Sequence, residues 1–245
     1  MDIINWLFKI TNSYERNARL YPALVALIPV LAIYGFTFNI KIGFFGGLIM
    51  LVVFSLLQAI VRDLGKSRED SLYESWGGKP TTQLLRHRDD KIDSITKMRY
   101  HIFLSNKIGV GFSLASDEKN NEAGADEIYQ SGINWLLENT RDNKRFNILF
   151  KELANYGFHR NCLPLKWPAI AISLASILWT LFIQKVLSLR GIDLKAFASM
   201  SYTAWLPLAV SIVMIFIWLA FITESAAKKS AFTYALTLLK ACDTL

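Results

Sequence analysis

One short segment of this chain combines the residue types that bind phosphate. It reads Trp76-Gly77-Gly78-Lys79-Pro80-Thr81-Thr82, and two arginines follow it closely. Consecutive glycines can present their N–H groups to an anion, lysine and arginine clamp phosphate oxygens, and a tryptophan ring stacks on nucleic-acid bases. The predicted ligand-binding residues are Trp76, Gly77, Gly78, Lys79, Thr81, Arg86, Arg88 and Arg160.

The same segment also fits a purely structural role. Gly77-Gly78-Lys79-Pro80 is a turn sequence, and a helix after it would bring Arg86 and Arg88 near Asp89, Asp90 or lipid phosphate. The segment is not a Walker motif, because the spacing differs and a proline follows the lysine. Both interpretations stay open at the level of the sequence.

The sequence contains no set of residues suited to catalysis or to metal binding. Asp89 and Asp90 are adjacent, and neighbours on a helix diverge by about 100°, so the two carboxylates cannot converge on a metal ion as hydrolysis requires. Cys162, Cys242 and the three histidines are scattered along the chain, which excludes a disulfide framework and a clustered zinc site. We expect a non-enzyme with no catalytic residue, metal or cofactor.

The composition indicates a membrane protein. Hydrophobic residues make up 53% of the 245 residues and charged residues only 19%, whereas a typical soluble domain carries about 25% charge. Most of the charged residues lie between Arg62 and Lys166, which leaves two flanking regions nearly free of charge. This pattern excludes a plain cytosolic enzyme, a disordered tail and a fibrous repeat.

Four apolar stretches are long enough to cross a bilayer as helices. They are Tyr21–Phe38, Ile42–Val61, Pro168–Leu189 and Tyr202–Ile222. Short loops join them in two pairs, so we predict an all-α membrane protein in which two transmembrane helical hairpins flank a small helix-rich cytosolic domain. The expected parts are an amphipathic segment 1–20, hairpin 21–61, cytosolic domain 62–167, hairpin 168–222 and cytosolic tail 223–245.

The distribution of basic residues sets the expected orientation. Lysine and arginine are plentiful in the N-terminal arm, the central region and the tail, and sparse in the loops inside the two hairpins. The positive-inside rule therefore places both termini and the central region in the cytoplasm.

The N-terminal segment has an apolar face of its own. Ile3, Trp6, Leu7, Ile10 and Tyr14 recur at helical spacing, which is typical of a helix lying on the inner leaflet. The alternative is that this face packs against the cytosolic domain of the protein, and the two interpretations are equally open.

Helical spacing also recurs within the cytosolic region. It predicts a helix over 93–105, with Ile95, Met98 and Ile102 on one face, although Tyr100–Leu104 also fits a strand. It further predicts helices over 126–139 and over 140–156, the latter with Gly157 as its C-cap. Residues 106–124 are expected to form a loop. The acidic block 108–140 is expected to face solvent, and the basic blocks on either side are expected to face the lipid headgroups.

Polar side chains recur on two of the predicted spans at helical spacing. The candidate pore-lining residues are Ser55, Gln58, Ser173, Ser176, Thr180 and Gln184. Polar groups in a bilayer should face protein or water rather than lipid. Hydrogen bonding between helices of a tight bundle is the better explanation of the small hydroxyl groups alone, whereas Gln58 and Gln184 favour a pore, so both roles stay open.

Two strings in this arrangement resemble a known family. They are Tyr156-Gly157-Phe158-His159-Arg160-Asn161, continued by Leu163, Leu165, Lys166 and Pro168, and Trp76-Gly77-Gly78-Lys79-Pro80-Thr81. Placed between two hairpins, they resemble the SMODS-associating four-transmembrane effector family, whose bacterial members are encoded beside nucleotide-synthesising enzymes in antiphage defence systems.

The resemblance implies a membrane effector of the bacterial inner membrane. Its cytosolic domain would bind a nucleotide or short oligonucleotide second messenger from a partner nucleotidyltransferase, and its spans would form or gate a pore in the lipid bilayer. It also implies a homo-oligomer, with a tetramer favoured. The alternative function is a non-channel membrane adaptor that docks a partner protein through its cytosolic domain.

Overall fold

The computed structural model describes residues 13–37, 44–188 and 191–245, and leaves out the side chains of residues 36–37, 44–52 and 54. The predicted face formed by Ile3 to Ile10, the loop 38–41 and the start of the second span lie outside the described residues. The described chain is almost entirely helical, and its strands are limited to the two-residue β1 (Leu187–Ser188) and β2 (Gly191–Ile192). The predicted all-α class is therefore confirmed.

The chain divides into two compact units. Unit 1 comprises Met1–Arg68 and Gly157–Ala226, and unit 2 comprises Glu69–Tyr156 and Ala227–Leu245. The boundary after Arg68 falls inside the long helix α4 (Phe44–Trp76), and the boundary after Tyr156 falls inside α9 (Asn147–Ile183). The last residues of the chain belong to unit 2, whereas the sequence had suggested a separate tail.

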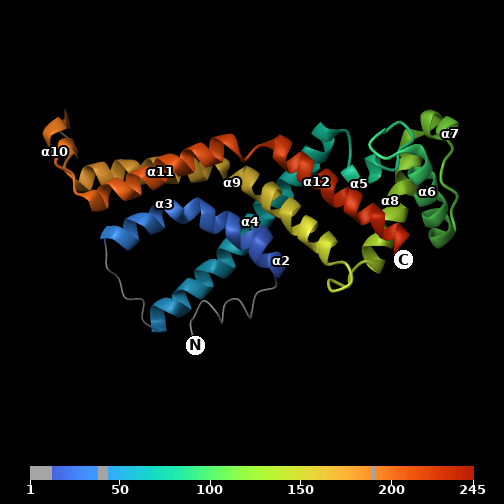
Figure 1. The fold of residues 1–245 in the computed structure, drawn as a ribbon, viewed down its shortest axis with the longest axis horizontal. Coiled ribbons are helices and arrows are strands. Elements are labelled where there is room, and N and C mark those ends of the chain that lie inside the picture. Colours follow the sequence, from blue (N-terminus) through green and yellow to red (C-terminus); the bar gives the residue numbers. More distant parts are fainter. Residues whose placement is uncertain (1–12, 38–43, 189–190) are drawn as a thin grey trace. The chain divides into compact units, whose positions relative to one another are not determined.

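Unit 1 contains the most apolar helices. Its elements are α2 (Ser13–Glu15), the π-helix η1 (Arg16–Leu20), α3 (Tyr21–Thr37), parts of α4 and α9, the β1–β2 hairpin, α10 (Leu194–Ala198) and α11 (Tyr202–Ala220). Helices α3, α9 and α11 lie side by side (Figure 1), and share a core that includes Ala26, Cys162, Ala169 and Trp218. Small side chains let the helix backbones approach closely, as in membrane bundles.

Three helical stretches within the described residues are long and apolar enough to span a membrane. They are Ser13–Gly35, Asn147–Ile183 and Tyr202–Ala220. These agree with the first, third and fourth predicted spans. The second predicted span corresponds to the first half of α4, which is helical from Phe44 onward.

Helix α9 corrects two sequence expectations. Gly157 does not end a helix and Pro168 does not begin one, because α9 runs through both. A Cβ at Gly157 would meet the Cβ of Ala18 in η1, so this glycine permits close helix packing. The helix continues through Pro164 and Pro168, although an internal proline costs about 3 kcal/mol.

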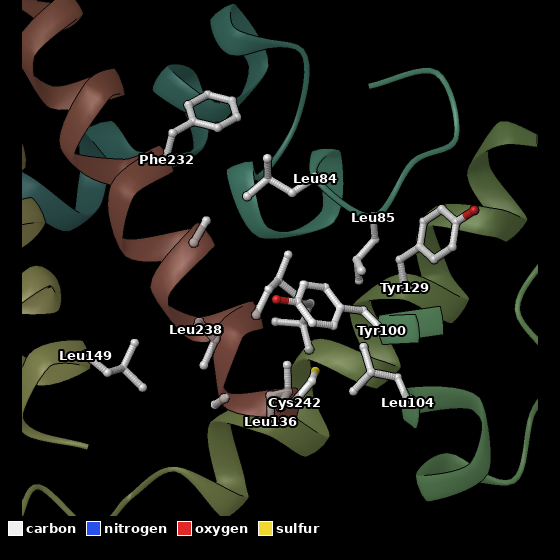
Figure 2. Close-up of a cluster of buried hydrophobic side chains, with 14 of the residues drawn as sticks. Leu84, Leu85, Tyr100, Leu104, Tyr129, Leu136, Leu149, Phe232, Leu238 and Cys242 are labelled. Carbon is white, nitrogen blue, oxygen red and sulfur yellow. The ribbon is translucent and has the colours of Figure 1, made fainter. Parts of the chain in front are cut away.

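Unit 2 is a small helical domain with its own core. Its helices are α5 (Pro80–Gln83), α6 (Ser94–Ile108), α7 (Ala115–Asn120), α8 (Glu122–Asn139), the start of α9, most of α12 (Glu224–Leu239) and the 3-10 turn η2 (Lys240–Asp243). Figure 2 shows Leu84, Tyr100 and Tyr129 gathered with Leu238 and Cys242 in one buried cluster. The C-terminal residues therefore complete the core of this domain.

Helices α6 and α8 lie where the sequence predicted them. Asp93 caps α6, because its carboxylate accepts a hydrogen bond from the N–H of Thr96. Gly109, with φ +69°, ends α6 in the left-handed conformation that glycine favours. The expected loop 106–124 is wrong in part, since it contains the short helix α7.

The apolar face predicted on α6 is exposed to solvent. Ile95, Met98 and Ile102 are 74%, 63% and 56% exposed. The opposite face of α6 contributes Tyr100 and Leu104 to the core. Unit 2 thus carries an apolar helix face that the rest of unit 2 leaves exposed.

Candidate functional site

The two glycines of the predicted phosphate-binding segment end helix α4. The N–H of Gly77 donates to the carbonyl of Glu74 at 3.1 Å, and the N–H of Gly78 donates to that of Tyr73 at 2.7 Å. This pair of bonds is a Schellman motif, which favours a positive φ at its first residue, Gly77 (+86°). Gly78 also has a positive φ, +122°. Because these N–H groups close the helix, they are not presented to an anion.

Arg86 is held by partners within unit 2. Its Nε and Nη2 atoms donate to the two carboxylate oxygens of Asp126 at 2.8 and 2.5 Å, and its Nη1 donates to the carbonyl of Gly77 at 2.7 Å. Hydrogen bonding to Asp126 raises the pKa of Arg86 above its ordinary value. The guanidinium therefore ties the turn after α4 to helix α8.

Arg88 also meets carboxylates of unit 2. Its Nη1 lies 2.8 Å from Glu122 and 3.7 Å from the buried Glu118. Glu118 also accepts hydrogen bonds from the N–H of His87 and the hydroxyl of Tyr129, both at 2.7 Å. Burial alone would raise the pKa of Glu118, but these hydrogen bonds outweigh burial and lower it. The acidic block that the sequence placed in solvent is thus partly neutralised by the two arginines.

The remaining predicted ligand residues are unevenly placed. Trp76 is buried, so its ring is not presented for stacking, while Lys79 is exposed and Thr81 is half-buried. Arg160 lies in unit 1, where its Nε donates to Asn161 at 3.2 Å. The structure brings the residues from Trp76 to Arg88 into one corner of unit 2 and does not place Arg160 in that unit.

The net charge of the chain belongs to unit 1. Its sequence holds 12 basic and 5 acidic residues, whereas that of unit 2 holds 15 of each. Proteins that bind nucleic acid through phosphate contacts carry a basic surface. Unit 2 as a whole lacks that excess, and unit 1 carries the basic flanks that membrane helices favour on the cytoplasmic side.

Unit 2 contains an open groove of about 660 Å³ beside the exposed face of α6. Met98 and Ile102 form one wall, and Phe112 and Leu114, from the segment after α6, form the other. This volume is within the range of ligand and peptide sites.

One end of the groove is acidic. Asp89, Asp90 and Asp93 line it together with a single lysine, Lys97. The Lys97 ammonium is buried and donates to the carbonyls of Arg86, at 2.8 Å, and Asp89. Burial lowers the pKa of Lys97 below its usual value. The cation thus faces backbone oxygens, and Asp89 is paired with Lys91 at 2.8 Å, so Asp90 and Asp93 are the exposed carboxylates at this end of the groove.

Two histidines, His87 and His101, line the groove. The Nε2 of buried His101 lies 2.7 Å from the carbonyl of Leu85, and its ring contacts those of Phe112 and Tyr129. Burial lowers the pKa of His101 to about 4, so the ring is neutral at pH 7. The Nε2 of His87 lies 2.9 Å from the carbonyl of Ser113, and this contact holds the wall formed by Phe112 and Leu114.

Sequence reasoning missed this groove. It singled out the helical spacing of Ile95, Met98 and Ile102, and two of these, Met98 and Ile102, line one wall of the groove. It contained no signal that the other wall, at Phe112 and Leu114, would turn back beside that helix.

Comparison of the chain with protein families, with curated proteins and with solved structures finds no match. Among the described residues, no cluster of histidine, cysteine and carboxylate side chains is arranged to hold a metal ion. The site is therefore interpreted from its own geometry.

The predicted pore-lining residues lie in unit 1. Ser173, Ser176 and Thr180 are buried, and the hydroxyls of Ser173 and Thr180 donate to carbonyls one turn earlier in α9 at 2.8 Å. These bonds lie within α9, so they do not decide between a pore role and hydrogen bonding between helices. Ser55 is exposed and Gln58 is half-buried on α4.

Gln184 adds a polar feature to the same helix end. Together with Thr180 and Thr203 it lines a cavity of about 190 Å³ near the junction of α9 and α11. A cavity with several polar groups has room for ordered water.

Proposed function

We propose that this protein is a membrane-anchored docking protein. Unit 1 holds the chain in the bilayer, and unit 2 binds a partner macromolecule in the groove beside α6. The observation that carries the proposal is the exposure of Ile95, Met98 and Ile102 on a helix whose other face is in the core.

The energetic argument concerns water-exposed apolar surface. Burying a large aliphatic side chain is worth about 1.5–3 kcal/mol, so three such side chains on one face are a substantial driving force for association. Contiguous apolar surface of this kind marks interaction sites in soluble domains. The concave groove beside it adds shape, which a flat patch lacks.

The anchoring half of the proposal follows from unit 1. Three span-length helices and a net excess of basic residues support a four-span arrangement of two hairpins in the bacterial inner membrane, with the termini in the cytoplasm. Unit 2 then lies in the cytoplasm, where a soluble partner can reach the groove.

A nucleotide-gated pore in antiphage defence is the second candidate. The polar cavity at Thr180, Gln184 and Thr203 favours it, as does exposed Lys79 in the segment that carries the family resemblance. Against it, Arg86 and Arg88 are engaged by carboxylates, so a phosphate ligand would have to displace those partners.

Gentle solubilisation of the tagged full chain from its native host tests the first candidate. We expect a stoichiometric partner to co-elute with the wild-type protein and to be lost from Met98→Asp. Glu127→Lys, an exposed change on α8 outside the groove, should retain it. Equal recovery of the same proteins with all three chains would contradict docking at α6.

Dye release from liposomes tests the second candidate. Release that requires a cyclic nucleotide or short oligonucleotide, and that changes in Gln184→Leu, would favour the pore. Absence of release with every ligand at low salt leaves the docking function as the better explanation.

A further inference from the structure

We propose that the groove beside α6 binds a cationic amphipathic helix of the partner protein. This inference rests on the proposed docking function and specifies the chemistry of its ligand. Two features of the groove carry it, the spacing of the apolar side chains and the sign of the charge at one end.

The apolar side chains match the footprint of a helix. Ile95, Met98 and Ile102 follow one another at intervals of three and four residues, and so form a stripe about 10 Å long. Phe112 and Leu114 stand on the opposite side of the groove. Met98 and Ile102 line the groove, and Ile95 extends the stripe beyond it. One apolar face of a helix can cover the three side chains together, which is the helix-in-groove mode of recognition.

Methionine suits such a surface. Met98 stands between the two isoleucines and is 63% exposed. Its unbranched thioether adapts to differently shaped apolar partners. A single flexible side chain between two stiff ones lets the stripe fit a helix without backbone movement.

The charge at the mouth of the groove selects a cationic partner. Asp90 and Asp93 are exposed there, and Asp89 lines the same end. Lys91 pairs with Asp89 at 2.8 Å and the Lys97 ammonium is held by two backbone carbonyls, which leaves the exposed Asp90 and Asp93 as the carboxylates that a cationic partner would meet. Lysine or arginine at one end of an incoming helix would meet these carboxylates while its apolar face covers Met98.

The same charges argue against a lipid surface as the occupant. An anionic leaflet attracts basic residues and is repelled by carboxylates. Anionic ligands such as free nucleotides are disfavoured at this groove for the same reason. A membrane contact at α6 is therefore treated as an outcome that would overturn the proposal.

The experiment uses the full chain in nanodiscs of zwitterionic phosphatidylcholine, with a photo-crosslinking amino acid in place of Met98. Two 18-residue fluorescent peptides serve as probes, an amphipathic leucine–lysine helix and the same helix with glutamate for lysine. Empty nanodiscs measure the peptide bound by lipid alone. We expect the lysine peptide to crosslink at position 98 and the glutamate peptide to crosslink at least tenfold less.

Two substitutions in the otherwise wild-type chain separate the apolar and the charged contributions to peptide affinity. Ile102→Asp should weaken binding of the lysine peptide at least tenfold at any salt concentration. Asp90→Lys should weaken it about tenfold at low salt and much less at 0.5 M salt, because salt screens exposed charges. Glu127→Lys makes the same charge change on α8 and should leave the affinity within about twofold. Melting temperatures confirm that each variant is folded.

The outcomes distinguish this inference from the docking function. Equal crosslinking of both peptides, with no effect of Asp90→Lys, would overturn the cationic partner while leaving docking intact. Absence of crosslinking by either peptide would overturn both. Loss of lysine-peptide crosslinking when phosphatidylglycerol is added to the nanodisc, with lipid adducts at position 98 instead, would show that the face contacts the leaflet and would overturn the proposal.

Discussion

Arg86 and Asp126 form a two-point ion pair, with Nε–Oδ1 and Nη2–Oδ2 distances of 2.8 and 2.5 Å. The pair joins the turn after α5 to helix α8, two segments that are far apart in the sequence. Arg86 also holds the Gly77 carbonyl, so one guanidinium satisfies three oxygen atoms. Its role in unit 2 is accordingly structural.

Arg86→Ala should destabilise unit 2 by about 1–3 kcal/mol, because it leaves a half-buried carboxylate without its charged hydrogen-bond donor. Urea unfolding followed by tryptophan fluorescence measures the effect. Arg141→Ala provides the control, since its ion pair with Glu138 is exposed and should contribute no more than about 1 kcal/mol. Unchanged stability in Arg86→Ala would contradict the structural role of Arg86 and favour a ligand-binding role.

The turn that ends α4 should resist substitution at both glycines. Gly77→Ala forces an L-residue to φ +86°, which costs about 1–2 kcal/mol. Gly78→Ala should cost more, because a Cβ there would lie 2.7 Å from the Arg86 guanidinium. Gly111→Ala, at a position with open space and no positive φ, should be nearly neutral. Similar melting temperatures for all three variants would contradict the structural role of the turn.

Local sequence patterns predicted α6 and α8 but missed α7 and began the next helix at 140, seven residues before α9 begins at Asn147. The spacing of Ile95, Met98 and Ile102 sufficed for α6. Whether an apolar stripe is covered depends on distant segments, so the sequence could not tell that this one faces solvent. Arg86 illustrates the same limit, because its partner Asp126 follows forty residues later.

The role of Gly157 was equally beyond local reasoning. A glycine after an apolar run resembles a C-cap, and only the contact with Ala18 explains it. The spans were predictable because their signal is composition over about twenty residues, which does not depend on tertiary contacts.

His101 should make unit 2 less stable in mild acid. Burial lowers its pKa in the folded protein to about 4 from an ordinary value of 6.5. The unfolded chain therefore binds a proton that the folded chain does not, and stability falls as the pH drops from 6.5 toward 4. The slope from this group is at most about 1.4 kcal/mol per pH unit.

The wild-type protein and His101→Gln should be compared by urea unfolding at several pH values. Above pH 7 their difference in unfolding free energy should be constant, and between pH 6.5 and 4 the variant should lose less stability. Other titrating groups near the ring, His87, Lys97 and Glu118, contribute to both proteins. Parallel pH curves would show that His101 does not carry the effect.

Asn161 should be a stability determinant of unit 1. It is fully buried and its Nδ2 donates to the Ala18 carbonyl in the π-helix η1 at 2.6 Å. Asn161→Ala should cost about 1–3 kcal/mol by leaving that carbonyl unsatisfied. Gly65→Ala should be comparably harmful, since its Cβ would overlap the Asn161 side-chain oxygen. Gly35→Ala, which has open space, is the control, and thermal aggregation in detergent is the readout.

The orientation of the chain can be tested by cysteine labelling. The native thiols interfere little, because Cys162 and Cys242 are both buried, and burial raises the pKa of Cys242 to about 12. Ser199 is exposed next to α10, and Ser116 is exposed on α7 in unit 2. With the termini and unit 2 in the cytoplasm, an impermeant maleimide should label Ser199→Cys in intact spheroplasts. Ser116→Cys should react only after the membrane is permeabilised, because the bilayer separates the cytoplasmic side from the reagent.

Labelling of Ser116→Cys in intact spheroplasts would reverse the orientation and place the groove beside α6 outside the cell. It would also restrict the partner of that groove to proteins of the outer compartment.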